Sequence, residues 1–509
     1  MSQAEAFLKG EANPQIVTIQ NYKIKEIGPK HGLFKRIYFN VTVEPVVLLY
    51  ILSSTMYQLT SQNLYLEKTC RVHLGYNVSV CDAMSERNES GYSSIEEAEV
   101  QKHVSKLFAF ASFVQGFFPV CLMLFVGSWS DRHNRRKPLI LVPILGEIVA
   151  VSLLILNTIY FEEIPVVFAA ISTTLPPALT GGWPCLLLGV YSYISAVSDD
   201  NNKTAKVGAC SSVQNLALII GLGSAGLLLG PLGFLKVYSI CFVMLLVALI
   251  YGYWRIEDTE IIHTSSTTKK EKGLLLDFFN IKYCIKTLVV FFRKGPNNRK
   301  WKLIVIIFVT ILVQGAIQGE YAVTYLYTRY KFKWNEMDYS LFFTVHSVMD
   351  LIGSFIALVI LSKYFGWKDA SLGILALIST GSADLMYAFA PNYKVFYAGV
   401  LLDIFYTITY IALRSLMAKI VSPDELGQSN SVFGLCEALM PSVFGPLYTK
   451  VYAHSIEYFP GMYYFISLVM YTLAICFFIW LYKQTREDEV DGKQMKEIKA
   501  RPSDDDEDE

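Results

Sequence analysis

Two long apolar runs flank one short basic segment, residues 127–139, which reads GSWSDRHNRRKPL. Each run is long enough to cross a bilayer as a helix, which takes about 20 residues. The segment between them carries four cations, Arg132, Arg135, Arg136 and Lys137. Because cytoplasmic loops of membrane proteins are enriched in Lys and Arg, the pattern predicts a short cytoplasmic hairpin between two membrane helices.

The composition is that of a membrane protein. Of the 509 residues, 53% are hydrophobic and only 17% are charged, whereas soluble domains carry about 25% charged residues. The formal net charge is zero, so overall charge gives no reason to expect nucleic acid as a partner. The sequence has no glycine-rich phosphate loop, metal-ligand set or nucleophile elbow, and we therefore expect neither an enzyme nor a cofactor or metal.

The apolar runs predict an all-α membrane protein with twelve transmembrane helices in two six-helix pseudo-repeats. Spans of about 20 residues or more are expected in the first half at 41–60, 105–126, 138–160, 165–197, 205–229 and 233–255. In the second half they are expected at 301–328, 338–362, 369–390, 395–420, 428–452 and 461–483. The fourth span is interrupted by prolines and glycines, which are tolerated where a discontinuous helix lines a cavity; these are Pro176, Pro177, Gly181, Gly182 and Pro184.

The remaining segments complete the expected organisation. It comprises a cytoplasmic leader (1–40), an N-terminal half (41–255), a cytoplasmic connection (256–300), a C-terminal half (301–483) and an acidic, disordered cytoplasmic tail (484–509). The halves echo each other: GPL at 230–232 recurs at 445–447, and the basic hairpin has a degraded counterpart at 361–372. Both matches are six spans apart, a pattern typical of duplicated transporters.

The long loop 61–104 carries two glycosylation sequons, at Asn77 and Asn88, and two cysteines, Cys70 and Cys81. These features indicate the oxidising, extracytoplasmic side of a membrane. We expect a Cys70–Cys81 disulfide, the alternative being two free thiols. The connection 256–300 is rich in Lys and Arg and belongs on the opposite side, so both termini are expected in the cytoplasm.

The basic hairpin resembles a pattern of the major facilitator superfamily, roughly G-x-x-S-D-R-x-G-R-R-x-x-L. Asn134 replaces the usual glycine, and Asn tolerates the left-handed backbone of a tight turn. The resemblance implies that the hairpin acts as a cytoplasmic gate that holds one conformation. The matching residues are Gly127, Ser130, Asp131, Arg132, Arg135, Arg136 and Leu139.

Further segments look like the proton-coupled folate transporter family, solute carrier family forty-six. They are VEPVVLLY from Val43, ALRSLMAKIVSPDELGQ from Ala412 and GLCEALMPSVFGPLYTKVY from Gly434. This resemblance implies proton-driven uptake of an organic, often anionic solute, and it assigns the family's span-ten arginine to Arg414. Folate carriers also have an acidic residue in span five, whereas residues 204–230 contain none.

Polar residues inside spans are costly and are therefore candidates for function. In span ten, Asp403, Thr407, Tyr410 and Arg414 are four, three and four residues apart, which would place them on one helical face. Span seven has the same spacing, and together the two stripes predict one wall of a central cavity. The span-seven residues are Gln314, Gln318, Tyr321 and Tyr325.

Arg414 is the predicted anion-binding residue, because a guanidinium binds carboxylate or phosphate through paired hydrogen bonds. The alternative is an internal salt bridge with Asp403 or Glu437. Candidates for proton coupling are Glu437, Glu320, His346 and Asp350, since buried carboxyls and histidines titrate near neutral pH. Their alternative role is structural hydrogen bonding or packing. Asp384 is left without a role.

The predicted function is secondary active transport of an organic, anionic solute by alternating access, coupled to protons. The alternatives are a facilitated-diffusion carrier and a transporter-like receptor or scaffold. The expected partners are a small organic solute, protons and membrane lipid, with the chain acting as a monomer. The expected location is the plasma membrane or an endo-lysosomal membrane.

Overall fold

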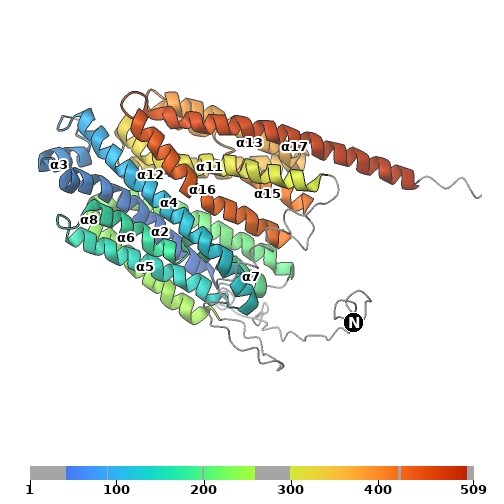
Figure 1. Cartoon of the computed structure of the whole chain (residues 1–509), viewed down its shortest axis with the longest axis horizontal. Coiled ribbons are helices and arrows are strands. Elements are labelled where there is room, and N and C mark those ends of the chain that lie inside the picture. Colours follow the sequence, from blue (N-terminus) through green and yellow to red (C-terminus); the bar gives the residue numbers. More distant parts are fainter. Residues whose placement is uncertain are drawn as a thin grey trace, which may run out of the picture.

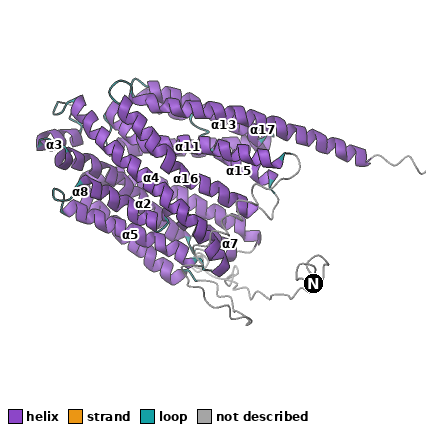
Figure 2. Ribbon diagram, in the orientation of Figure 1, coloured by secondary structure: helices purple, strands orange, loops and turns teal. Residues whose placement is uncertain are grey.

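The computed structural model describes residues 42–88, 90–133, 135–197, 200–257, 298–421 and 426–500. Over these residues the regular structure is helical, and no strand is present (Figures 1 and 2). The expected leader, all but the ends of the 256–300 connection and the last nine residues lie outside the described part of the chain.

The N-terminal helices run from α2 to α8. They are α2 (Glu44–Lys68), the π-helical η2 (Thr69–His73), α3 (Val78–Glu86), α4 (Ser94–His133), α5 (Lys137–Ile159), α6 (Val166–Leu179), α7 (Gly182–Val197) and α8 (Asp200–Arg255). Within α8 two helical segments meet at Gly233, whose φ of 70° and ψ of 172° are not helical. Only glycine adopts such a backbone readily, so the bend lies where the sequence permits it.

The C-terminal helices run from α11 to α17. They are α11 (Arg299–Phe332), α12 (Glu336–Phe355), the π-helical η3 (Ile356–Tyr364), α13 (Asp369–Phe389), α14 (Tyr393–Leu402), α15 (Ile408–Ile420), α16 (Leu426–Ser455), the 3₁₀ turn η5 (Pro460–Met462) and α17 (Tyr463–Ala500). Each of the expected spans overlaps one or two of these helices or a segment of α8.

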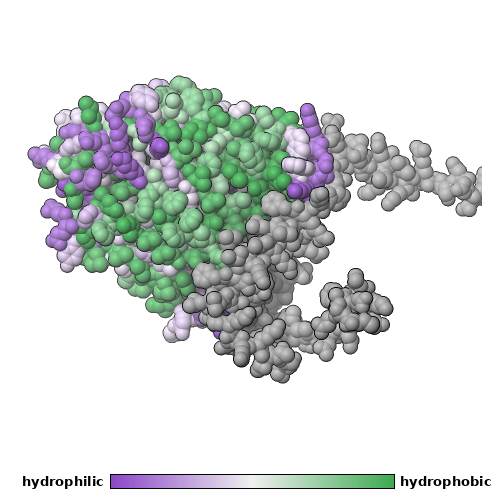
Figure 3. Space-filling view, viewed as in Figure 1, coloured by the Kyte–Doolittle hydropathy of each residue, from purple (hydrophilic) through white to green (hydrophobic). Residues whose placement is uncertain are grey.

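Seven helical stretches of the described chain are long and apolar enough to cross a membrane on their own. Apolar side chains cover the middle of the molecule, and polar side chains gather at the end that carries α3 (Figure 3). This distribution is that of a protein with an apolar belt between two aqueous ends.

The C-terminal tail differs from the expectation. Disorder was expected from residue 484, but α17 continues to Ala500 and projects beyond the other helices (Figure 1). Opposite charges recur four residues apart in this stretch, as at Glu489 and Lys493. That spacing favours a solvated helix, and the acidic run at 503–509 lies outside the described residues.

The most extensive contacts between the N-terminal and C-terminal helices are those of α4 with α16 and of α8 with α12. Small residues allow the close approach: the Ser442 hydroxyl donates to the Phe113 carbonyl at 3.1 Å, and a side chain at Gly116 would collide with Ser442. On the other pair, the Ser340 hydroxyl donates to the Leu222 carbonyl at 2.8 Å. Helices in membranes use small residues for this purpose.

The expected span 395–420 is not one helix. α14 ends at Leu402 and α15 begins at Ile408, so Asp403 and Arg414 do not share a continuous helical face as predicted. Partners from neighbouring helices replace the missing helical hydrogen bonds. The Ser379 hydroxyl donates to the Leu402 carbonyl, and the amide and hydroxyl of Thr407 both donate to the Asp350 carboxylate. A carboxylate at the start of a helix also suits the helix dipole.

The break depends on close approach of α12. A side chain at Gly353 would overlap the carbonyl oxygen of Ile404, a backbone atom that cannot rotate away. Glycine is therefore required at this position by contact with the non-helical segment rather than by its own backbone angles, which are helical.

We expect Gly353→Ala to destabilise the protein, because overpacking against backbone costs about 1–3 kcal/mol. The measurement is the midpoint of thermal unfolding in detergent. Gly434→Ala is the matched control, since no atom lies within 4 Å of the added carbon, and it should be neutral or slightly stabilising because alanine favours a helix. Equal unfolding midpoints for the two variants would contradict this account of the break.

Candidate functional site

Three of the four predicted span-ten residues pair with side chains of other helices. Asp403 lies 2.8 Å from Nε2 of His346 on α12, and Thr407 binds Asp350. Arg414 forms an ion pair with Glu437 on α16 at 3.2 Å. The segment therefore presents a series of polar pairs from near Asp403 to Arg414.

The Arg414–Glu437 pair is the most accessible of these. Its side chains are 42% and 22% exposed. The guanidinium lies over the rings of Tyr410 and Phe433, at 4.8 and 5.2 Å from their centroids. Among the described residues, Nε of Arg414 and Oε1 of Glu437 have no hydrogen-bond partner. Of the two salt bridges considered from the sequence, the structure has the one with Glu437.

Unused hydrogen-bond donors of Arg414 allow this pair to bind a ligand. A guanidinium has five donors in a planar fork, and only one bond to Glu437 is made. An anionic group could therefore bind the remaining donors, with two aromatic rings beside it. The ligand could also replace Glu437 as the partner of Arg414.

The span-seven residues divide into two groups on α11. Gln314 and Gln318 are half-buried, and Tyr321 is 43% exposed. Tyr325 is buried, and its hydroxyl donates to Oδ1 of Asn63 on α2. The stripe is thus accessible at one end and closed by an N-terminal helix at the other.

The closed end continues through contacts that sequence reasoning missed. Arg329 also donates to Asn63, at 3.0 Å, and Lys333 pairs with the buried Glu97 at 2.7 Å. Glu97 also binds Arg87 at 2.8 Å. We call these five residues with Tyr325 the disulfide-end seam, because they link α2 and α4 to α11, and α3 to α4, at the end of the molecule that carries the Cys70–Cys81 loop. No local pattern in the sequence pairs them.

Glu320 and Asp384 form a second buried group on the C-terminal helices. Glu320 is 9% exposed and Asp384 is 1% exposed. Their carboxyls lie within hydrogen-bonding reach of each other, and Glu320 also faces Ser467 and Tyr471 of α17. The sequence singled out Glu320 but assigned nothing to Asp384.

Glu147 on α5 has a different environment. The hydroxyls of Tyr50 and Ser54 donate to its Oε1 at 2.9 and 3.3 Å, and the hydroxyl of Tyr57 donates to Oε2. All three donors come from α2. Their one-sided spacing along α2 was the available signal, because residues three and four apart share a helical face.

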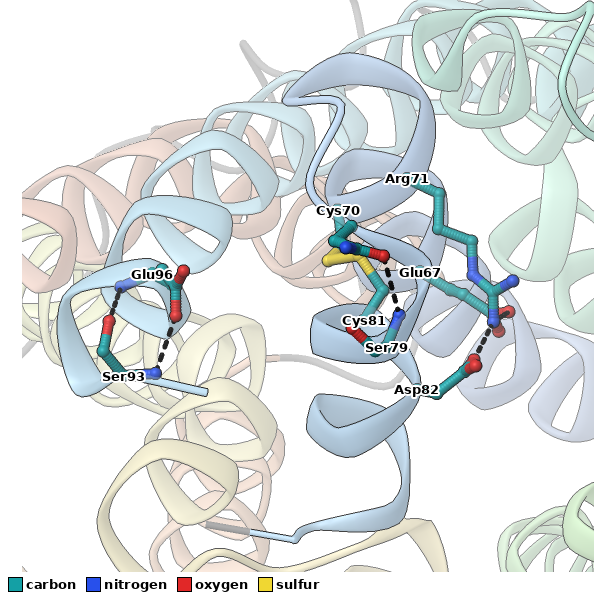
Figure 4. Close-up of a disulfide and its surroundings, with 9 residues drawn as sticks. Glu67, Cys70, Arg71, Ser79, Cys81, Asp82, Ser93 and Glu96 are labelled. Atoms are coloured by element: carbon teal, nitrogen blue, oxygen red, sulfur yellow. Dashed lines mark hydrogen bonds and ion pairs between the residues drawn. A yellow bond between two sulfur atoms is a disulfide. The ribbon is translucent and has the colours of Figure 1, made fainter. Parts of the chain in front are cut away.

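The loop 61–104 is compact. Cys70 and Cys81 form a disulfide with Cα atoms 5.9 Å apart, and Arg71 binds Glu67 and Asp82 beside it (Figure 4). Asn77 caps α3, and both it and Asn88 are exposed. Both asparagines are thus sterically available for modification.

The basic hairpin is short, since α4 ends at His133 and α5 begins at Lys137. Gly127, Asp131 and Arg132 lie in the last turns of α4, and their side chains lie outside the described part of the structure. Arg135 is exposed and Arg136 is half-buried. In the described residues, no set of three or more His, Cys, Asp or Glu side chains is arranged to hold a metal ion.

The family model of the Major Facilitator Superfamily matches residues 94–446 and 322–503. A Drosophila melanogaster protein named probable peptidoglycan muropeptide transporter SLC46 is 21% identical over 85% of this chain and 84% of its own length. A Gallus gallus protein named lysosomal proton-coupled steroid conjugate and bile acid symporter SLC46A3 is 22% identical over 86% of this chain and 93% of its own.

Solved structures share the fold. A POT family transporter in complex with 5-aminolevulinic acid aligns with a TM-score of 0.59 at 12% identity, over 91% of this chain and 99% of its own. The human organic anion transporter MFSD10 aligns with a TM-score of 0.54 at 14% identity, over 86% and 98%. With a family model that matches most of its length, this chain belongs to the Major Facilitator Superfamily, as a membrane transporter similar to solute carrier family 46 and not an enzyme.

Proposed function

We propose that this chain is a proton-coupled carrier of a small organic anion. Its twelve membrane spans form two six-helix halves, α2–α8 and α11–α17, which rock against each other by alternating access. The solute binds between the halves near Arg414. The chain works as a monomer surrounded by lipid, with both termini in the cytoplasm.

The observation that carries this proposal is the exposed Arg414–Glu437 pair with its unused donors. A charge held within a membrane-spanning region is costly and is retained where it serves transport. A salt bridge that only stabilises the fold needs hydrogen bonds to its remaining donors and acceptors. In the described structure, Nε of Arg414 has no such bond. Binding an anion there would complete the hydrogen bonds of Arg414 and displace Glu437 as its partner.

The positions of the contacts between halves support an inward-facing state. The disulfide-end seam holds α11 against α2 and α4, and Lys102 pairs with Glu457 at 2.6 Å at the same end. Arg414 and Glu437 lie toward the other end of their helices and are partly exposed. A carrier closed outside and open inside has this arrangement.

The named cargoes of two relatives fit such a site. One relative is named for muropeptides and the other for steroid conjugates and bile acids. Arg414 would bind the acidic group of a solute of this size, and Tyr410 and Phe433 would contact its apolar or ring portion. The second relative's name also includes proton coupling and a lysosomal location, which supports proton coupling and an endo-lysosomal membrane, with the plasma membrane as the alternative.

The two alternatives make different demands. A facilitated-diffusion carrier would transport the solute equally well without a proton gradient. A receptor or scaffold would keep the fold but would not need exposed, incompletely paired charges between its halves. The Arg414–Glu437 pair therefore favours transport over a scaffold role.

We expect glycans at Asn77 and Asn88, because both are exposed on the loop with the disulfide. Treatment with a glycosidase that removes N-linked glycans should increase the mobility of the protein on a denaturing gel. Asn77→Gln and Asn88→Gln should each remove part of that shift, and the double variant should remove all of it. A full shift in the double variant would contradict the proposed orientation.

Uptake into cells should be tested with labelled sulfated steroids, muropeptide fragments, folates and cyclic dinucleotides at pH about 5.5 and about 7.4. We expect greater uptake of at least one compound at the lower external pH. Arg414→Ala should reduce that uptake by about tenfold or more, since a hydrogen bond to a charged group contributes about 1.5–3 kcal/mol.

Arg414→Lys is the matched control. It keeps the charge but loses the planar fork, so it should retain more uptake than Arg414→Ala. Surface expression of each variant is measured in parallel. Full uptake by Arg414→Ala would refute the assignment of the anion site, and pH-independent uptake insensitive to a protonophore would favour facilitated diffusion.

A further inference from the structure

Two carboxyl groups meet inside the C-terminal helices, away from Arg414. Glu320 lies on α11 and Asp384 on α13, and α17 packs against both helices. The two side chains are within hydrogen-bonding reach of each other and are almost wholly buried. Two carboxylates this close cannot both be ionised in a medium of low dielectric constant.

The hydrogen bonding around the pair is incomplete. In the part of the chain that the structure describes, Oε1 of Glu320 and Oδ2 of Asp384 are buried oxygens without a hydrogen-bond donor. The hydroxyl of Tyr471, whose residue is only 2% exposed, lies beside Glu320 and has no partner either. Buried polar atoms in native proteins are rarely left unpaired, so one donor is missing from this group.

The other acids in the membrane region already have donors. Glu147 receives three hydroxyls, and Asp350 receives the amide and hydroxyl of Thr407. Asp403 binds His346. Glu320 and Asp384 differ because each has the other's carboxyl within hydrogen-bonding reach.

A proton supplies the missing donor. With one proton on the pair, a carboxyl O–H donates to the facing carboxylate, and the total charge of the pair changes from −2 to −1. Over the described residues no lysine or arginine forms an ion pair with either carboxyl, and no group of acidic or histidine side chains is arranged to hold a metal ion. Among cations, the proton fits this site.

We propose that Glu320 and Asp384 share one proton and form the site that binds the coupling proton of transport. This inference rests on the proposed proton-coupled function and adds its location, in the C-terminal half and separate from the solute site. Asp384 is an equal member of the site with Glu320.

Neighbouring titratable groups connect the pair to the solute site. Asp403 lies near both carboxyls and binds His346. Asp350 lies near the same histidine, four residues further along α12. From α16 and α17, Tyr448 and Tyr471 face the pair. The polar pairs of the 403–414 segment then lead towards Arg414. Polar groups therefore line a route for a proton from the carboxyl pair towards Arg414.

Infrared spectroscopy of the purified, full-length protein tests occupancy without any solute. At pH about 7.4 the wild type should show the carbonyl stretch of a protonated carboxyl. Asp384→Asn and Glu320→Gln should each remove it, whereas Glu147→Gln, at a carboxyl with its own hydroxyl donors, should leave the band of the pair in place. Two variants are used so that misfolding of one, detected by size-exclusion chromatography, does not decide the result.

A wild-type spectrum without this band, or one that both variants leave unchanged, would overturn the proposal. The second measurement is uptake of a labelled sulfated steroid into proteoliposomes with and without an inward proton gradient. Asp384→Asn should remove the stimulation by the gradient but keep exchange of labelled for unlabelled steroid. Stimulation equal to that of the wild type would overturn the coupling role, whereas wild-type uptake without stimulation would refute the proposed function instead.

Discussion

The hydrocarbon core of a membrane offers no partner for a hydrogen bond, so the protein must supply one for each polar group placed there. The interruptions of the helices follow this constraint. Where α6 ends, the hydroxyl of Thr180 donates to the carbonyls of Pro176 and Pro177, both at 3.0 Å. Where α14 ends and α15 begins, side chains of α12 and α13 fulfil the same role.

The same constraint separates three kinds of acidic residue. Glu147 is supplied with hydroxyl donors and has the surroundings of a permanent structural group. In the described structure one oxygen of Glu320 and one of Asp384 lack a donor, and these surroundings suit a group that gains and loses a proton. Glu437 has a cation as partner and is accessible, which suits its replacement on Arg414 by an anionic ligand. Burial and supply of donors, rather than residue type, distinguish these roles.

Sequence reasoning succeeded where the signal is local. Runs of apolar residues located the helices, and the prolines and glycines near Gly181 correctly indicated the interruption between α6 and α7, where Gly181 has a φ of 90°. The interruption after Leu402 had no such signal, because residues 403–407 contain neither glycine nor proline. Its cause lies on other helices, at Asp350, Gly353 and Ser379. The pairing of Glu320 with Asp384 is likewise a long-range contact, and Asp384 looked in the sequence like any isolated acid in a span.

The disulfide-end seam is largely ionic, so its strength depends on the salt around it. Lys333, Glu97 and Arg87 are linked at the end of the molecule that carries the Cys70–Cys81 disulfide. Dissolved ions screen charges over about 8 Å at physiological ionic strength, and they stabilise separated charges more than paired ones. In the proposed orientation this end faces the outside or the lumen of an organelle, so the salt content of that compartment would shift the balance between the closed and open forms of the carrier.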